Sequence, residues 1–132
     1  MDDLASYASV FLQNAEDDLR SAAQASSAER YDVRNRAYNS QQAAEKALKA
    51  ALALTGVNFD RTHDLNQLCG GLPPDWGITW PPSDLARLTN MVATARYGNG
   101  GTAPSKSDAD WAFGIASDIV GAIRTGAARR GI

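Results

Sequence analysis

The stretch from Gln41 to Leu52, QQAAEKALKAAL, constrains the fold more than any other part of the chain. Almost every residue in it favours helix, and its apolar positions share one side of that helix: Ala44, Leu48 and Ala51. A second side carries polar residues spaced by four: Gln41, Glu45 and Lys49. Small alanine side chains allow a neighbouring helix to approach closely. The stretch therefore predicts a packed helix whose polar row is either a polar site or a seam between helices.

The first half of the chain predicts two long helices. Apolar residues at intervals of three and four indicate a helix over about residues 3–25 and a second over about 26–55. Ser26 and Glu29 fit a capping box at the start of the second helix, and Gly56 is a natural stop at its end. We expect the two helices to pack against each other as an antiparallel hairpin.

The second half predicts one short helix, two long helices and two irregular loops. Thr62 is the predicted N-cap of the short helix. The loops cover residues 72–82 and 98–104, where prolines and glycines interrupt any regular helix. Trp76 and Trp80 are expected to hold the first of these loops against the helices.

The expected architecture is an all-α, antiparallel bundle of four main helices plus one short helix. The last helix is predicted to start at a capping box made by Ser105 and Asp108. A chain of 132 residues is the size of one domain, so we expect a single domain over residues 1–132 with its core at about 4–123.

Composition excludes several classes of protein. A net charge of −2 and a pI near 5.2 provide no overall basic field for nucleic acid, although a local basic groove is compatible with both. Cys69 and His63 are the only cysteine and histidine, so no internal disulfide, zinc site or cofactor is expected. No stretch approaches the roughly 20 apolar residues of a membrane helix, and no signal peptide is visible. We expect a cytoplasmic protein without membrane association.

Several short strings occur in an order and spacing typical of one known family. They are Ala15–Leu19 (AEDDL), Gln41–Ala50 (QQAAEKALKA), Thr62–Leu65 (THDL) and Ala95–Tyr97 (ARY), followed by a helical stretch at Asp108–Ile123. Together they resemble the HEPN domain, named for higher eukaryotes and prokaryotes nucleotide-binding. The resemblance covers nearly the whole chain, and it rests on the ordered set of strings.

The resemblance implies an antiparallel helical bundle of a kind that often forms homodimers. Family members include nucleotide-binding modules and ribonuclease toxins. Many bacterial members work beside a small nucleotidyltransferase as two halves of a toxin–antitoxin system, and others act in defence against phage. Nuclease members carry an arginine and a histidine separated by four to six residues. That motif is absent here, because no arginine stands at residues 56–58 before His63 and no histidine follows Arg96.

Seven residues along these strings are candidate ligand-binding residues: Glu45, Lys46, Lys49, His63, Asp64, Arg96 and Tyr97. His63 is a candidate general acid or base, or a residue that caps the short helix or packs against the preceding one. Arg96 could bind phosphate, bond the last carbonyl groups of its own helix, or pair with Glu45. Glu45, Lys46 and Lys49 either border a nucleotide pocket or lie on a solvated helix face on which Glu45 pairs with Lys49. Tyr97 is expected to pack with its polar tip exposed.

A homodimer is expected from the alanine-rich stripes of the first two helices, at about 3–25 and 26–55. These stripes contain more small apolar surface than one small bundle needs to bury. A two-fold contact between identical chains is the commonest way to cover such a surface. The sequence therefore predicts a dimer at micromolar concentration.

These observations favour a dimeric module that binds a nucleotide, RNA or a partner protein without catalysis. The expected setting is a toxin–antitoxin or defence system with a nucleotidyltransferase partner. The alternative is a metal-independent ribonuclease that uses Arg96 and His63 across a dimer cleft. In it His63 takes the proton of a ribose 2′-hydroxyl and Arg96 stabilises charge on the phosphate. A scaffold dimer without a ligand is a third reading. The missing nuclease motif favours the first of these functions.

Overall fold

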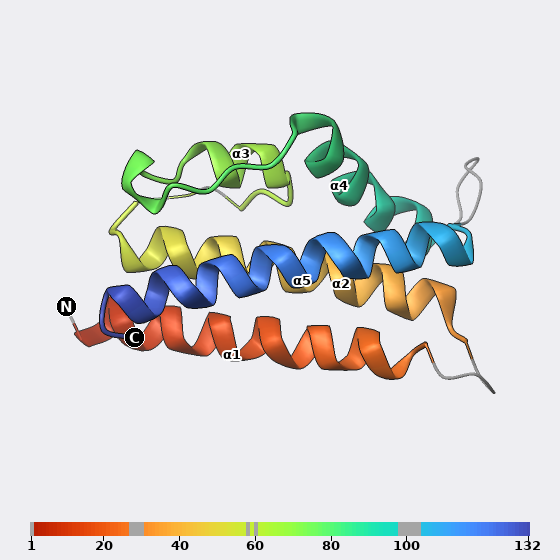
Figure 1. Ribbon diagram of the computed structural model, residues 1–132, viewed down its shortest axis with the longest axis horizontal. Helices are drawn as coiled ribbons and strands as arrows, with labels where there is room; N and C mark the ends of the chain where they lie inside the picture. Colours follow the sequence, from red (N-terminus) through yellow and green to blue (C-terminus); the bar gives the residue numbers. More distant parts are fainter. Residues whose placement is uncertain (1, 27–30, 58, 60, 98–103) are drawn as a thin grey trace.

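The computed structural model describes residues 2–26, 31–57, 59, 61–97 and 104–132, with the backbone alone for 2–4 and 92–97 (Figure 1). Its helices are α1 (Asp2–Gln24), α2 (Val33–Leu54), α3 (Leu65–Gly70), α4 (Pro82–Tyr97) and α5 (Lys106–Arg129), with a short 3-10 helix, η1, at Pro74–Trp76. No β-strand occurs among these residues. The predicted all-α bundle of four long helices and one short helix is therefore confirmed.

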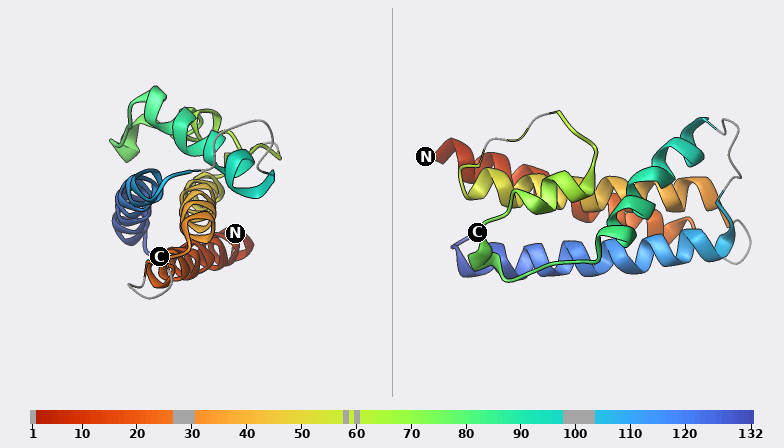
Figure 2. Two further views of the ribbon diagram at one scale, coloured as in Figure 1. Left: turned by 90° about the vertical axis from the view of Figure 1, so that its right-hand side faces the viewer. Right: turned by 90° about the horizontal axis from the view of Figure 1, so that it is seen from above.

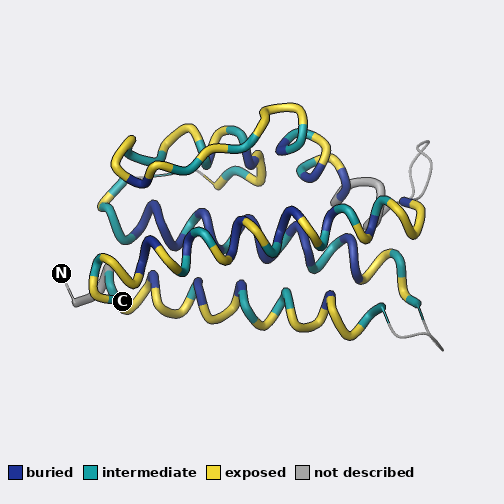
Figure 3. The backbone as a smooth tube through the Cα atoms, viewed as in Figure 1, coloured by how far each residue is buried: buried dark blue, intermediate teal, exposed yellow. Residues whose placement is uncertain are grey.

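Helix α2 is the centre of the bundle. It contacts each of the other four helices, and α1 runs antiparallel beside it as the predicted hairpin (Figure 1). Helix α5 lies against both α1 and α2, while α3, α4 and the loop between them form a layer on the side away from α1 (Figure 2). Burial follows this arrangement, because α2 is buried along most of its length whereas α1 is buried on one side only (Figure 3).

Most alanines of α1 and α2 are buried within one chain. The most deeply buried alanines, each at most 5% exposed, include Ala8, Ala15, Ala22, Ala37, Ala43, Ala44, Ala47, Ala50, Ala51 and Ala53. Small side chains allow neighbouring helices to approach α2 from several sides, which explains why they are so frequent. The premise that these stripes need a second chain to cover them is therefore wrong. A dimer has to be argued from another surface.

The predicted start of α2 is wrong. Helix α2 begins at Val33, and its N-cap is Asp32, which accepts a hydrogen bond from the backbone N–H of Asn35 at 3.0 Å. Ser26 instead donates to the Ala23 carbonyl oxygen at 2.7 Å, so its hydroxyl closes the end of α1. Its predicted partner in the capping box, Glu29, lies outside the described residues.

The N-cap of α3 is Asp64 and not Thr62. The Asp64 carboxylate accepts from the N–H of Asn66 at 3.0 Å, while the Thr62 hydroxyl accepts from the N–H of Asp64 at 3.1 Å. Thr62 therefore forms a turn that leads into the helix. The capping box at the start of α5 is confirmed, since Ser105 and Asp108 each accept a hydrogen bond from the other's backbone N–H.

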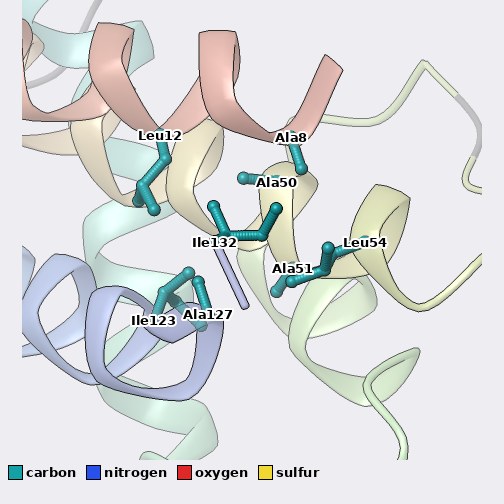
Figure 4. Close-up of a pocket in the computed structure, with 8 residues that line it drawn as sticks. All are labelled: Ala8, Leu12, Ala50, Ala51, Leu54, Ile123, Ala127 and Ile132. Carbon is teal, nitrogen blue, oxygen red and sulfur yellow. The ribbon is translucent and has the colours of Figure 1, made fainter. Parts of the chain in front are cut away.

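Two helices end in the same left-handed glycine turn. Gly56 follows α2 with a φ of +71°, and the N–H of Val57 bonds the Leu52 carbonyl oxygen at 2.9 Å, which confirms Gly56 as the stop. Gly131 has a φ of +86° after α5 and turns Ile132 back toward the helices. The Ile132 side chain enters an apolar pocket between α1, α2 and α5 (Figure 4).

The loop between α3 and α4 is held down by Trp76, as predicted. This indole is only 6% exposed, and its ring lies against Gly126 of α5. The Arg130 guanidinium stacks 3.8 Å from the ring centroid and donates to the Asp75 carboxylate at 2.8 Å. Trp80 is partly buried against the core, so both tryptophans anchor the loop.

Substitution of Gly126 by alanine should destabilise the protein. A Cβ atom at this position would lie 2.3 Å from Cζ3 of Trp76, so the ring would have to move out of its site. We expect a loss of about 1–3 kcal/mol in the free energy of unfolding, measured by urea denaturation. Gly114→Ala is the matched control, since a Cβ there meets no atom within 4 Å and should stabilise α5. Equal effects of the two substitutions would contradict this explanation of Gly126.

Candidate functional site

A buried carboxylate, that of Glu45, lies at the centre of the polar row on α2. Glu45 is 4% exposed, yet its oxygens accept hydrogen bonds from three side chains. Lys49 Nζ lies 3.0 Å from Oε2, and Gln41 Nε2 lies 3.2 Å from Oε1. The third partner is His63, whose Nδ1 lies 3.0 Å from Oε1. These bonds satisfy the carboxylate and allow it to remain charged inside the bundle.

His63 reaches Glu45 from the segment that precedes α3. The turn at Thr62 and the cap at Asp64 place the imidazole over α2, and its side chain stays 74% exposed. Because Nδ1 faces a carboxylate, this nitrogen carries the hydrogen in the neutral ring. The other ring nitrogen, Nε2, is then the one available to a ligand. The geometry is that of an exposed imidazole oriented by a buried acid.

The polar row of α2 is not a solvated helix face. Gln41 is fully buried, and Gln42 donates to its side-chain oxygen at 2.8 Å. The side chain of Lys49 is only 14% exposed. The Glu45–Lys49 pair exists, but it belongs to a buried network that extends along α2. The alternative of an exposed ion pair is therefore wrong.

The other candidate residues do not all join this network. Lys46 lies on a different side of α2, where its Nζ is 2.7 Å from the Asp18 carboxylate of α1. Asp64 uses its carboxylate as the cap of α3. Arg96 and Tyr97 lie in the last turn of α4, and their side chains are outside the described residues. Their predicted roles in ligand binding stay predictions.

Two residues near His63 were not among the candidates. Gln41 belongs to the Glu45 network, and its position one helical turn before Glu45 was the available signal. Arg61 is exposed two residues before His63, and within the described residues it forms no ion pair. An exposed guanidinium can bind phosphate groups through its several N–H donors. Arg61 is therefore a further candidate residue, by its place in the chain two residues before His63.

The protonation of Glu45 predicts a specific pH dependence of stability. Burial raises the pKa of Glu45, but the hydrogen bonds from Lys49, Gln41 and His63 outweigh it and lower the pKa below the ordinary value of 4.5. The unfolded chain therefore takes up this proton first as the pH falls, and the stabilisation is lost from about pH 5 downward.

Glu45→Gln should remove this contribution, so its stability relative to the native chain should improve as the pH falls from 6 to 3.5. Urea denaturation across this range measures the difference. Asp108 and Asp110, whose pKa values are also lowered, are present in both proteins and cancel in the comparison. A difference independent of pH would contradict the assigned charge on Glu45.

The surroundings of the site contain no second reactive cluster among the described residues. No group of three or more histidine, cysteine, aspartate and glutamate side chains lies close enough there to hold a metal ion. Burial raises the pKa of the Cys69 thiol, and a backbone hydrogen bond with Trp80 opposes that effect only in part. A small cavity of about 130 Å³ lies beside the segment that precedes α3, and Val57, Phe59 and Thr62 form part of its lining.

Comparison with known protein families gives one match. The model of the HEPN domain family matches residues 8–125, a range that includes the whole Glu45 network. Searches among curated proteins and among solved structures found no match. In the part of the chain that the structure describes, no helix is long and apolar enough to cross a membrane.

Proposed function

Because the chain belongs to the HEPN domain family, we propose that it is a dimeric module that binds a nucleotide or RNA. Its setting would be a cytoplasmic toxin–antitoxin or defence system with a nucleotidyltransferase as partner protein, as in many members of the family. One observation carries the ligand-binding part of the proposal. It is the exposed imidazole of His63, held in place by the buried carboxylate of Glu45.

The chemistry of this site suits a ribonucleotide. Nε2 of His63 can accept a hydrogen bond from a ribose hydroxyl and, when the ring is protonated, can donate one to a phosphate oxygen. Arg61 supplies further donors from an exposed position two residues away. The Glu45 network underneath limits how far the imidazole can turn, so the site is organised before the ligand arrives.

A ribonuclease is the second candidate, and one observation favours it. A carboxylate on Nδ1 holds the imidazole in the tautomer that a general base needs, with Nε2 able to take the proton of a 2′-hydroxyl. Arg96 would then stabilise charge on the phosphate from the end of α4. The absent arginine–histidine motif still favours binding without cleavage.

Fluorescence anisotropy with a labelled single-stranded RNA, in buffer with EDTA, tests the proposal. Saturable binding that unlabelled RNA or ATP displaces would support a nucleotide-binding module. Gel electrophoresis of the same samples shows whether the RNA is cut, and cleavage would favour the second candidate. A folded protein that binds neither RNA nor ATP would refute the ligand-binding part and leave the partner-binding role to be tested.

A further inference from the structure

Helix α5 presents a stripe of exposed and half-exposed residues that continues along its length. Its members are spaced by three and four, so they share one side of the helix: Lys106, Asp110, Phe113, Ser117, Gly121, Arg124 and Ala128. The opposite side of α5 provides much of the core, including Ile119 and Ile123. This spacing is also the one that lets two helices pack along a continuous seam.

Gly121 leaves a gap in this stripe of α5. A Cβ atom there would meet no atom within 4 Å, and the residue lies in the interior of a helix with ordinary backbone angles. Glycine at such a position destabilises a helix by roughly 0.5–1 kcal/mol relative to alanine. Gly126 differs, because Trp76 fills the space beside it. Gly114 of α5 also faces open space, but it lies outside the stripe, whereas Gly121 leaves a gap within it that a side chain of another molecule would fit.

The surface beside the stripe is a groove between α1 and α5. It has a volume of about 420 Å³, and apolar atoms from both helices line it, among them Leu19, Ala23, Phe113 and Val120. The ion pair between Glu16 and Arg124 bridges the two helices at this groove. An apolar groove between two helices fits another helix better than it fits a compact polar ligand.

The stripe is complementary to itself when a second copy runs antiparallel to it. Phe113 lies four residues before Ser117 and Gly121 lies four residues after it, while Asp110 and Arg124 are each seven residues away. An antiparallel pair centred on Ser117 therefore places the Phe113 ring of each copy at the gap left by Gly121 of the other. It also places Asp110 opposite Arg124 twice.

Two of the three charged side chains of this stripe, Asp110 and Arg124, can take a further partner. Asp110 already accepts from Arg36 and Tyr31, and Arg124 pairs with Glu16, yet the side chains of Asp110 and Arg124 remain 48% and 41% exposed. Opposite charges facing each other at both ends of a contact set its register and direction. The Phe113 ring, the gap at Gly121 and the charges of Asp110 and Arg124 all belong to one helix. A closed two-fold interface requires such a self-complementary surface.

We propose that a second copy of this chain packs its α5 antiparallel against this stripe, with the two-fold axis at Ser117. The inference rests on the homodimer in the proposed function and names its surface. The α5 of each copy then lies along the groove of the other, so that α1 and α5 of both chains form a four-helix interface. The Glu45 network lies outside this interface.

Light scattering on the purified chain and on Gly121→Arg tests the interface. The arginine side chain should fit the isolated chain, because a Cβ atom at this position meets no atom within 4 Å. It should weaken dimerisation at least tenfold, because it fills the gap that the Phe113 ring of the second copy would occupy. Circular dichroism confirms that the variant is folded. Val10→Arg is the matched control, since Val10 is 58% exposed and nine residues from Leu19, on the opposite side of α1. It should leave the dimer intact.

A cysteine at the axis provides an independent measurement. Ser117→Cys, in a Cys69→Ala background, should form an intermolecular disulfide under mild oxidation, whereas Thr125→Cys outside the stripe should not. A dimer that survives Gly121→Arg, or a Ser117→Cys dimer that fails to crosslink, would place the interface elsewhere and leave the homodimer standing. A native chain that is monomeric would refute both the proposed interface and the homodimer. RNA binding is measured separately, so its outcome is distinguishable from theirs.

Discussion

Glu45→Ala is expected to lower the free energy of unfolding by about 2–4 kcal/mol, a large effect for a charged residue. Gln41 is fully buried, and it would lose the acceptor of its side-chain N–H. The Lys49 amine, in a side chain that is 14% exposed, would lose its negative partner. Buried polar groups left without partners are what make such a truncation costly.

Asp17→Ala provides the matched control for this substitution. Asp17 also forms an ion pair, with Arg20, but the two side chains are 52% and 63% exposed. Water replaces the lost partner at such a position, so we expect less than about 1 kcal/mol. Urea denaturation of both variants at pH 7 measures the difference. Similar losses for Asp17→Ala and Glu45→Ala would contradict the structural role given to the Glu45 network.

His63→Asn should weaken the binding of RNA or nucleotide by roughly ten- to a hundredfold, the effect of losing a hydrogen bond to a charged group. The asparagine amide can still donate to Glu45, but it has no counterpart of Nε2, so the substitution isolates the outward nitrogen. The free energy of unfolding should change by less than about 1 kcal/mol, because the His63 side chain is 74% exposed. A change in affinity without a change in stability is the signature of a ligand-binding role.

Arg34→Ala controls for the loss of a positive charge. Arg34 is exposed in the first turn of α2, eleven residues before Glu45 and about 16 Å away along the helix, so its removal should affect RNA binding little. Fluorescence anisotropy compares the two variants with the native chain. If His63→Asn bound RNA as tightly as the native chain, His63 would have only a structural role. If both variants lost affinity equally, general charge would explain the binding.

The helices of this protein were predictable from periodicity because that signal is local. Each long helix carries apolar residues at intervals of three and four, and the turn at Gly56 needs only the residues beside it. The start of α2 was harder, since Ser26 and Asp32 are both good N-cap residues. Their roles were decided by the return of the chain to α1, where Asp32 N–H bonds the Ala25 carbonyl oxygen at 2.8 Å.

The candidate site was predictable residue by residue but not as a network. Glu45, Lys49 and His63 were singled out, yet nothing in the spacing of eighteen residues between Glu45 and His63 requires them to meet. Whether the polar row of α2 is buried depends on which segments cover it, and that is a non-local property. Lys46 could have been set aside, because adjacent helical positions lie about 100° apart.

The surface for a second chain was also misplaced by sequence patterns. Alanine is frequent in α2 because the helix is surrounded within one chain, and the same composition would suit an interface between two chains. The surface of α5 is distinguished by the symmetric placement of Phe113 and Gly121, and of Asp110 and Arg124, about Ser117. Which side of α5 is exposed depends on the arrangement of the helices around it.

The central claim, that a ribonucleotide binds at the imidazole held by Glu45, has a direct test because His63 is the only histidine. A long-range ¹H–¹⁵N spectrum of the ¹⁵N-labelled, untagged chain contains imidazole signals from His63 alone. We predict the tautomer with hydrogen on Nδ1, and an Nε2 signal that shifts as RNA or ATP is added and saturates with the anisotropy curve. Binding that leaves both imidazole signals unchanged would contradict this site.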